Sequence, residues 1–179
     1  NETNHLCLVE EYLPGREFAI SIMGPLVRQD GEFVIHGGPF AFSAVQRVFE
    51  PHEKIFTSMD EKPITDDRIR LLDLSRESGL IREMEHLARQ VFAWFTLSSL
   101  VRLDLRESGD GELHLLEANP KPDLKRPSEH SASITCRGLA QRKMSYADLI
   151  VSILAERLTV LAKTGKKDSA ILKKLMVTS

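Results

Sequence analysis

The 179-residue chain has few of the features that mark secreted, membrane-bound or nucleic-acid-binding proteins. Cys7 and Cys136 are its two cysteines, too few for a disulfide framework and typical of a reducing compartment. No hydrophobic run approaches the length of a membrane span and no signal peptide is visible, so we expect a cytoplasmic protein without a membrane partner. The net charge is −2 with both signs mixed along the chain, which argues against nucleic acid as the main partner.

Repeats, low-complexity tracts and Ser-His or Cys-His constellations are also absent from the sequence. His36 and His52 have no metal-ligand spacing with each other or with the cysteines, so we interpret them as structural or solvated. A chain of this length is enough for one domain or for one large piece of a bigger enzyme.

What the sequence does contain is a pair of alternating segments, residues 100–106 and 112–119, around the turn residues Asp110 and Gly111. This pattern predicts a β-hairpin with a two-residue loop. One face of the hairpin is apolar and suits a protein core. Its residues are Val101, Leu103, Leu105, Leu116 and Ala118.

The opposite face of the predicted hairpin is polar. A two-residue loop places Asp104 opposite Glu117, and it also places Arg102 opposite Asn119. Cross-strand neighbours have Cβ atoms roughly 4.5–5.5 Å apart, close enough for two carboxylates to share a hard cation. Half-buried hairpins also alternate in this way when their polar face is simply solvated, so the hairpin pattern leaves both interpretations open.

The order of the apolar patterns predicts an α+β domain with an antiparallel sheet flanked by helices. From Arg68 the pattern is helical, and apolar residues at three- and four-residue spacings over residues 80–95 place Trp94 and Phe95 in the core. A capping box from Ser145 to Asp148 begins a second helix that closes near Gly165. Besides the hairpin, strands are predicted at residues 6–12, 17–23, 32–36 and 43–49, the first two as a hairpin-like pair.

Two loops have compositions suited to ligand binding. Residues 51–63 are polar and hold Lys54 and Lys62. Residues 120–127 contain three prolines and a basic cluster, and prolines restrict the backbone in a way that can present side chains to a ligand. A solvated connector is the alternative for this second loop, and composition leaves both interpretations open.

Four blocks of the chain, in order over about residues 8–155, resemble the carboxyl-terminal half of ATP-grasp ligases, in particular the D-alanine–D-alanine ligase branch. The blocks are Val-Glu-Glu-Tyr-Leu-Pro-Gly-Arg-Glu-Phe at 9–18, Arg-Leu-Asp at 102–104, Leu-Leu-Glu-Ala-Asn-Pro-Lys-Pro at 115–122, and Met-Ser-Tyr-Ala-Asp-Leu-Ile at 144–150. The resemblance implies an ATP-grasp C-terminal lobe over residues 1–165, followed by a basic helix or tail over residues 166–179.

The resemblance also implies an ATP site. Glu10 corresponds to the residue near the adenine amino group, and Glu17 to the residue that holds the ribose hydroxyls. Lys54 is a better candidate than Lys62 for a loop lysine that contacts phosphate. The remaining adenine contacts would come from the backbone of Glu11, Tyr12 and Leu13.

The hairpin and the loop after it correspond to the reacting end of the nucleotide. By resemblance, Asp104, Glu117 and Asn119 are the ligands of Mg²⁺ or Mn²⁺ ions that bridge the phosphates. Arg102 corresponds to the arginine that steadies the transferring phosphoryl group. Ser128 falls at the position of a serine that meets the carboxylate of the incoming amino acid.

The implied reaction joins an amino acid or another carboxylate to an amine. The carboxylate attacks the γ-phosphate of ATP to give an acyl phosphate, which the amine then attacks to form an amide. Asp123 stands where the dipeptide ligases have a glycine, and it lies among basic residues. The acceptor is therefore expected to be more acidic than D-alanine or to differ from it in shape.

The blocks do not cover the amino-terminal and central lobes that complete the site in such ligases. We therefore expect this chain to be an inactive fragment whose partners are those lobes, and a homodimer stays open. Two alternatives are a non-catalytic nucleotide-binding or interaction module with the same fold and an enzyme that makes a thioester or an ester. Intact Arg102, Asp104, Glu117 and Asn119 argue against the first alternative.

Overall fold

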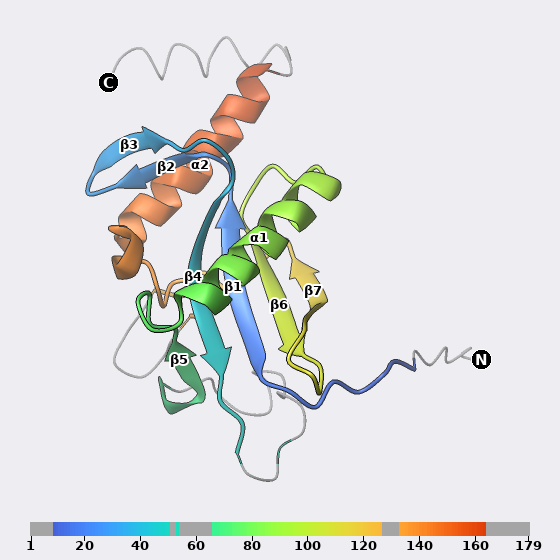
Figure 1. The fold of residues 1–179 in the computed structure, drawn as a ribbon. Coiled ribbons are helices and arrows are strands. Elements are labelled where there is room, and N and C mark those ends of the chain that lie inside the picture. The colour runs from blue at the N-terminus through green and yellow to red at the C-terminus, as the bar shows by residue number, and fades with distance from the viewer. Residues whose placement is uncertain (1–8, 51–52, 54–65, 127–132, 164–179) are drawn as a thin grey trace, which may run out of the picture.

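A five-stranded antiparallel sheet forms the centre of the computed structural model, which describes residues 9–50, 53, 66–126 and 133–163 (Figure 1). Its strands, in the spatial order β5-β4-β1-β6-β7, are β1 (Glu17–Met23), β4 (Phe40–Arg47), β5 (Ile69–Leu71), β6 (Val101–Glu107) and β7 (Leu113–Asn119). A separate hairpin joins β2 (Leu26–Gln29) to β3 (Glu32–Ile35). The helices are α1 (Ser78–Trp94) and α2 (Tyr146–Lys163), with short 3₁₀ turns η1 (Asp66–Arg68) and η2 (Ala140–Arg142). The predicted α+β class with an antiparallel sheet is confirmed.

Helix α1 covers one face of the sheet because its apolar residues recur at helical spacing and lie along one side. The sheet residues in this cluster alternate along the strands and include Phe18, Ile20, Ile22, Val101, Leu103 and Leu105. The predicted core position of Trp94 and Phe95 is wrong, since their side chains are 71% and 65% exposed. The helix ends at Trp94, so the apolar stripe extends past the part that packs on the sheet.

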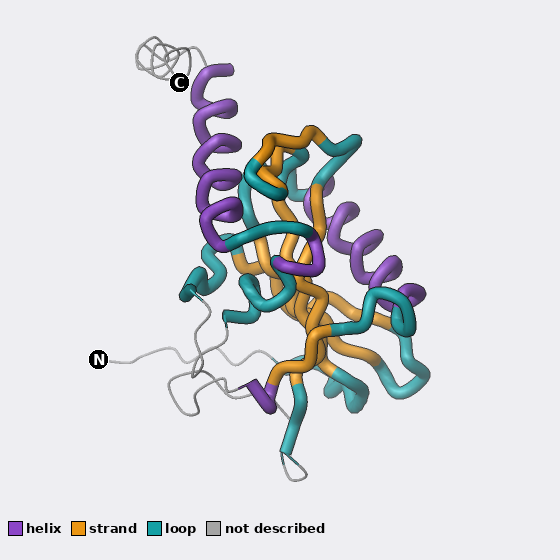
Figure 2. The backbone as a smooth tube through the Cα atoms, turned by 90° about the vertical axis from the view of Figure 1, so that its left-hand side faces the viewer, coloured by secondary structure: helices purple, strands orange, loops and turns teal. Residues whose placement is uncertain are grey.

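Helix α2 lies on the other side of the strands, and the β2–β3 hairpin packs against it (Figure 2). Leu149 of α2 is fully buried against apolar residues of β1, β2 and β4. The two helices therefore bury opposite faces of one sheet, and each polar residue on a central strand belongs to one of these faces. None of the described helices is long and apolar enough to cross a membrane.

Strand β4 contains a β-bulge that changes which of its residues face α2. Ala19 of β1 pairs with Val45, whereas Ser21 pairs with Phe42, so β4 holds one residue more than β1 between these pairs. Ser43 has a positive φ of 52°, and its hydroxyl accepts a hydrogen bond from the Gly138 amide at 2.8 Å. The bulge moves the residues after it into the opposite phase of the strand alternation.

The predicted strand over residues 6–12 is wrong for its described part, because residues 9–16 form no strand. Both edges of β1 are already paired, one with β4 and the other with β6, so β1 offers no edge to a preceding segment. The segment is instead fastened to the end of β6. The Gly15 amide donates to the Glu107 carbonyl at 3.0 Å, and the Glu107 amide donates to the Arg16 carbonyl at 2.9 Å.

The predicted strands 17–23 and 32–36 correspond to β1 and β3, and the helices agree to within a few residues. Strand β4 begins three residues before the predicted start at position 43. Strands β2 and β5 were not predicted, because four and three residues are too short to show an alternation. The helical interpretation from Arg68 onward is wrong for β5, and α1 begins at Ser78. The predicted basic segment 166–179 lies outside the described residues.

The predicted capping box is present at the start of α2. The Asp148 amide donates to the Ser145 hydroxyl oxygen at 3.0 Å, and the Ser145 amide donates to the Asp148 carboxylate at 2.9 Å. We expect Ser145→Ala to lower the free energy of unfolding by about 1 kcal/mol, because one helix amide loses its partner. Urea unfolding followed by circular dichroism measures this change, and an unchanged midpoint would contradict it.

Candidate functional site

The β6–β7 hairpin brings the predicted polar pairs together. Asp104 lies opposite Glu117 and Arg102 lies opposite Asn119, as the sequence predicted. The loop, however, is longer than two residues, because the Ser108 amide donates across it to the Glu112 carbonyl. The pairing near the loop is consequently offset by one residue from the predicted register.

A β-bulge restores the predicted register before the polar pairs. Leu105 pairs with Leu115 and the next pair is Asp104 with Glu117, so Leu116 is the extra residue. Leu116 is half exposed, and its predicted core position is wrong because an extra residue has no place in the alternation. The other residues predicted for this face, among them Leu103 and Ala118, contact the core.

Asp104 is the centre of an ion-pair network on the sheet face opposite α1. Arg102 grips it with two hydrogen bonds, from Nε to Oδ1 at 2.8 Å and from an amino nitrogen to Oδ2 at 2.9 Å. Arg47 of β4 also donates to Asp104 Oδ2 at 2.9 Å. The other end of the Arg47 guanidinium donates to Glu17 Oε1 at 2.5 Å.

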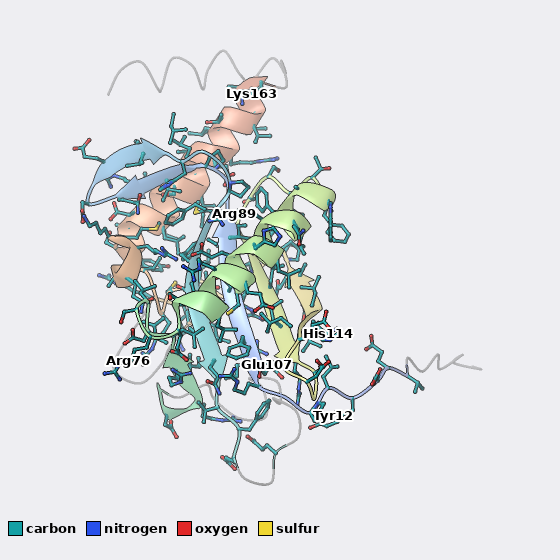
Figure 3. All side chains as sticks on the ribbon, viewed as in Figure 1. Tyr12, Arg76, Arg89, Glu107, His114 and Lys163 are labelled. Carbon is teal, nitrogen blue, oxygen red and sulfur yellow. The ribbon has the colours of Figure 1, made fainter. Side chains whose placement is uncertain are left out.

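Arg106 extends this network toward the segment before β1. It donates to Glu17 Oε2 at 3.2 Å and to the Tyr12 hydroxyl at 3.1 Å. Its guanidinium carbon also lies 5.0 Å from the centre of the Tyr12 ring and 5.1 Å from that of Phe49, within cation–π range. Tyr12 stands at the same end of the sheet as Glu107 (Figure 3).

We call Tyr12, Glu17, Arg47, Arg102, Asp104 and Arg106 the arginine network. Its two carboxylates are buried, Glu17 being 3% and Asp104 5% exposed. Three guanidinium groups share these two carboxylates. The forked donors of guanidinium groups suit an anion such as phosphate.

Arg47 and Arg106 had no predicted role. The alternation of β6 places Arg106 on the face of Arg102 and Asp104, so the strand pattern could have identified it. No sequence signal could have identified Arg47, because the bulge in β4 sets which face it joins.

The other predicted site residues lie outside the arginine network. Glu10 and Glu11 are exposed and Leu13 is half-buried, all within the irregular segment before β1. Glu117 is exposed on β7, and the Asn119 side-chain oxygen accepts a hydrogen bond from the Lys121 amide at 2.9 Å. Lys54 and Ser128 lie outside the described residues.

The donor set of the polar hairpin face fits Mg²⁺ in its chemistry. Asp104, Glu117 and Asn119 all offer oxygen, which hard cations prefer. Within residues 9–50, 53, 66–126 and 133–163, no group of three or more His, Cys, Asp or Glu side chains is positioned to hold a metal. Both oxygens of Asp104 also accept guanidinium hydrogen bonds, so a metal at Asp104 would have to displace a guanidinium nitrogen.

A pocket of about 650 Å³ opens beside the arginine network. Its walls come from the segment before β1, the end of β4 and the β6–β7 loop, and Arg47 belongs to both the pocket and the network. Aromatic and charged groups meet here, since Phe49, Arg16 and Glu107 also line it. A planar ring with an anionic group attached is a ligand that such walls can hold.

The described part of the loop that contains three prolines, residues 120–126, is hydrogen-bonded to Ser133 and to Tyr146, the first residue of α2. The Asp123 carbonyl accepts a hydrogen bond from the buried Ser133 hydroxyl at 2.7 Å, and the Asp123 carboxylate accepts one from the Lys125 amide at 2.9 Å. The Leu124 carbonyl accepts one from the Tyr146 hydroxyl at 2.8 Å. Asp123 thus lies in a hydrogen-bonded turn within the described part of this loop.

The fold is that of the carboxyl-terminal lobe of an ATP-grasp ligase. A sequence model of the family described as D-ala D-ala ligase C-terminus matches residues 1–155, and the chain belongs to this family. Among solved structures it is similar to D-alanyl-alanine synthetase A from Vibrio cholerae O1 biovar eltor, with 14% identity and a TM-score of 0.50. That match covers 80% of this chain and 38% of the synthetase, and a comparison with curated proteins gave no match.

Proposed function

We propose that this chain is the nucleotide-phosphate lobe of an ATP- and Mg²⁺-dependent carboxylate–amine ligase. The observation that carries the proposal is the polar hairpin face, where Arg102, Asp104, Glu117 and Asn119 occupy paired positions beside further guanidinium groups. Membership of the ligase family supports the reaction type. Phosphoryl transfer depends mainly on positioning and charge neutralisation, which these groups can supply.

Each of these residues would have a role that follows from its position in the fold. Asp104, Glu117 and Asn119 would hold Mg²⁺, which neutralises phosphate charge when it is bound. Arg102 is anchored by Asp104 and points along the same face, so its remaining donor capacity would serve the transferring phosphoryl group. Glu17 would reach the ribose only by giving up part of its contact with two arginines.

The described residues supply one wall of an active site. This chain spans 38% of the length of the synthetase it resembles. We therefore propose that other lobes complete the site and that the substrates are a carboxylate and an amine. We expect the purified 179-residue chain to bind Mg²⁺-ADP weakly and to show no ligase turnover. Robust ATP-dependent amide formation by this chain alone would contradict that expectation.

Titration of the chain with Mg²⁺-ADP, and with ADP in the presence of EDTA, tests the metal site. Glu117→Gln and Asn119→Ala are each expected to weaken Mg²⁺-ADP binding about tenfold, since each removes an oxygen ligand or lowers its charge. Neither substitution should weaken binding of ADP in EDTA. Glu112→Gln is the matched control, because Glu112 is exposed in the loop of the same hairpin. Equal binding of Mg²⁺-ADP by all four proteins would refute the proposed role.

A non-catalytic nucleotide-binding module is the second candidate. The observation that favours it is the engagement of both Asp104 oxygens by arginines, which gives a stable arrangement without a metal. The same titration separates the two candidates, because such a module would bind ADP equally well with Mg²⁺ and with EDTA.

A further inference from the structure

Arg47 joins the two buried carboxylates of the arginine network. Its guanidinium spans from Glu17 Oε1 at 2.5 Å to Asp104 Oδ2 at 2.9 Å, and its side chain is 11% exposed. Glu17 is the proposed ribose residue and Asp104 is a proposed metal ligand. The arginine therefore lies between the positions proposed for the sugar and for the metal-bound phosphates.

A cation arriving at Asp104 has to replace one of two arginines. Arg102 lies two residues away on the same strand and holds both oxygens of Asp104. Arg47 holds one oxygen and keeps a second, shorter contact with Glu17. Release of Asp104 by Arg47 therefore keeps the two Arg102 hydrogen bonds and leaves the Arg47 guanidinium anchored at Glu17.

The end of Arg47 that holds Asp104 lies on the sheet face opposite α1, and the Arg47 side chain is 11% exposed. Arg47 lines the pocket of about 650 Å³ that opens beside the network. A nucleotide that reached from Glu17 to Asp104 would carry its phosphates past this guanidinium. Arginine is well suited to such a contact because its forked donors match phosphate oxygens.

We propose that Arg47 is a nucleotide-binding residue that exchanges partners. Without nucleotide it neutralises Asp104 and occupies the cation's place there. When a nucleotide binds, the guanidinium nitrogen that held Asp104 donates to a phosphate oxygen instead, and Asp104 becomes available to a metal. This inference rests on the proposed nucleotide and metal site. It adds Arg47 to that site and states that Arg47 releases Asp104 when the nucleotide binds.

The exchange makes two binding equilibria respond to Arg47 in opposite directions. For a metal ion alone, Arg47 is a competitor at Asp104, so its removal should strengthen binding. For ADP without metal, Arg47 is a donor, so its removal should weaken binding. A purely structural arginine would change both affinities in the same direction or leave both unchanged.

The experiment compares the wild-type chain with Arg47→Gln and Arg47→Lys. Free Mn²⁺ is measured by electron paramagnetic resonance, and ADP binding in EDTA is measured by equilibrium dialysis. For Arg47→Gln we expect Mn²⁺ to bind at least threefold tighter and ADP about tenfold weaker. Arg70→Gln is the control, because Arg70 forms an exposed ion pair with Glu77 and its loss removes the same charge.

Arg47→Lys protects the test against misfolding, since glutamine leaves two buried carboxylates with fewer partners. Lysine keeps the charge but cannot bridge both carboxylates, so Mn²⁺ should still bind more tightly while ADP binding stays within about twofold. Unchanged Mn²⁺ and ADP binding in the folded variants would overturn the role of Arg47 alone. Failure of the wild-type chain to bind either probe would overturn the proposed function, and with it this inference.

Discussion

Replacement of Glu17 by alanine is expected to lower the free energy of unfolding by about 3–5 kcal/mol. Glu17 is 3% exposed, and its two oxygens accept hydrogen bonds from Arg47 and Arg106. Alanine removes the carboxylate that these two guanidinium groups share, and removal of one partner of a buried ion pair is far more costly than loss of a surface contact. Urea unfolding at neutral pH measures the change.

Glu77→Gln is the matched control for this prediction. Glu77 pairs with Arg70 at 2.7 Å, but both side chains are substantially exposed, so its loss should change stability by less than about 1 kcal/mol. A Glu17→Ala variant as stable as the control would show that the network is well hydrated in solution. The buried carboxylates would then contribute little to the stability of the sheet.

Variants of Glu17 and Asp104 do not separate ligand binding from folding. Glu17 and Asp104 are proposed to contact nucleotide or metal, yet both also neutralise arginines inside the sheet. Loss of binding in their variants therefore mixes two causes, lost contact and lost folding. Glu117 and Asn119 lie toward the surface of β7 and serve better as binding variants, because their removal leaves the buried ion pairs intact.

The hairpin shows why part of the site was predictable from sequence. Alternation in β6 and β7 set the polar face, and the pairing of Asp104 with Glu117 followed from a simple loop assumption. The loop assumption was wrong, and the pairing held because a one-residue bulge at Leu116 cancels the longer loop. Loop length and bulges depend on backbone hydrogen bonds across the turn, which residue patterns specify weakly.

Tertiary pairing explains the parts of the fold that the sequence pattern missed. Residues 9–16 have strand-like composition, but β4 and β6 already pair with both edges of β1. Arg47 joins the arginine network because a bulge at Ser43 shifts the phase of β4. Such effects arise between segments far apart in the chain, whereas the amphipathic stripe of α1 and the capping box of α2 are local and were predicted correctly.

The second large effect concerns Glu156 of α2, which should make the protein less stable as pH rises. Its side chain is buried against Gly24, and its Oε2 has no hydrogen-bond partner among the described residues. Burial raises the pKa of this carboxyl to about 7, opposed in part by a hydrogen bond from the Gly24 amide. The folded protein therefore binds this proton more tightly than the unfolded chain, in which the pKa is about 4.5.

The sign of the pH dependence follows from this difference in proton affinity. Between pH 4.5 and about 7 the folded state holds the proton that the unfolded state has released, so stability falls with rising pH. Glu156→Gln keeps the shape and removes the titration. It should be about 2 kcal/mol more stable than wild type at pH 8, a value reduced from the full shift to allow for partial hydration.

Urea unfolding of both proteins from pH 4 to 8 tests the prediction through their difference in stability. Asp148, on the same helix, has its pKa lowered by hydrogen bonds from Ser145, so it acts in the opposite direction at acidic pH. Because both proteins retain Asp148, its contribution cancels in the difference. Exposed Glu83→Gln should change stability by less than about 0.5 kcal/mol at every pH. If Glu156→Gln raises the free energy of unfolding by the same amount at pH 4 and at pH 8, the change comes from packing and not from titration of Glu156, which would contradict the prediction.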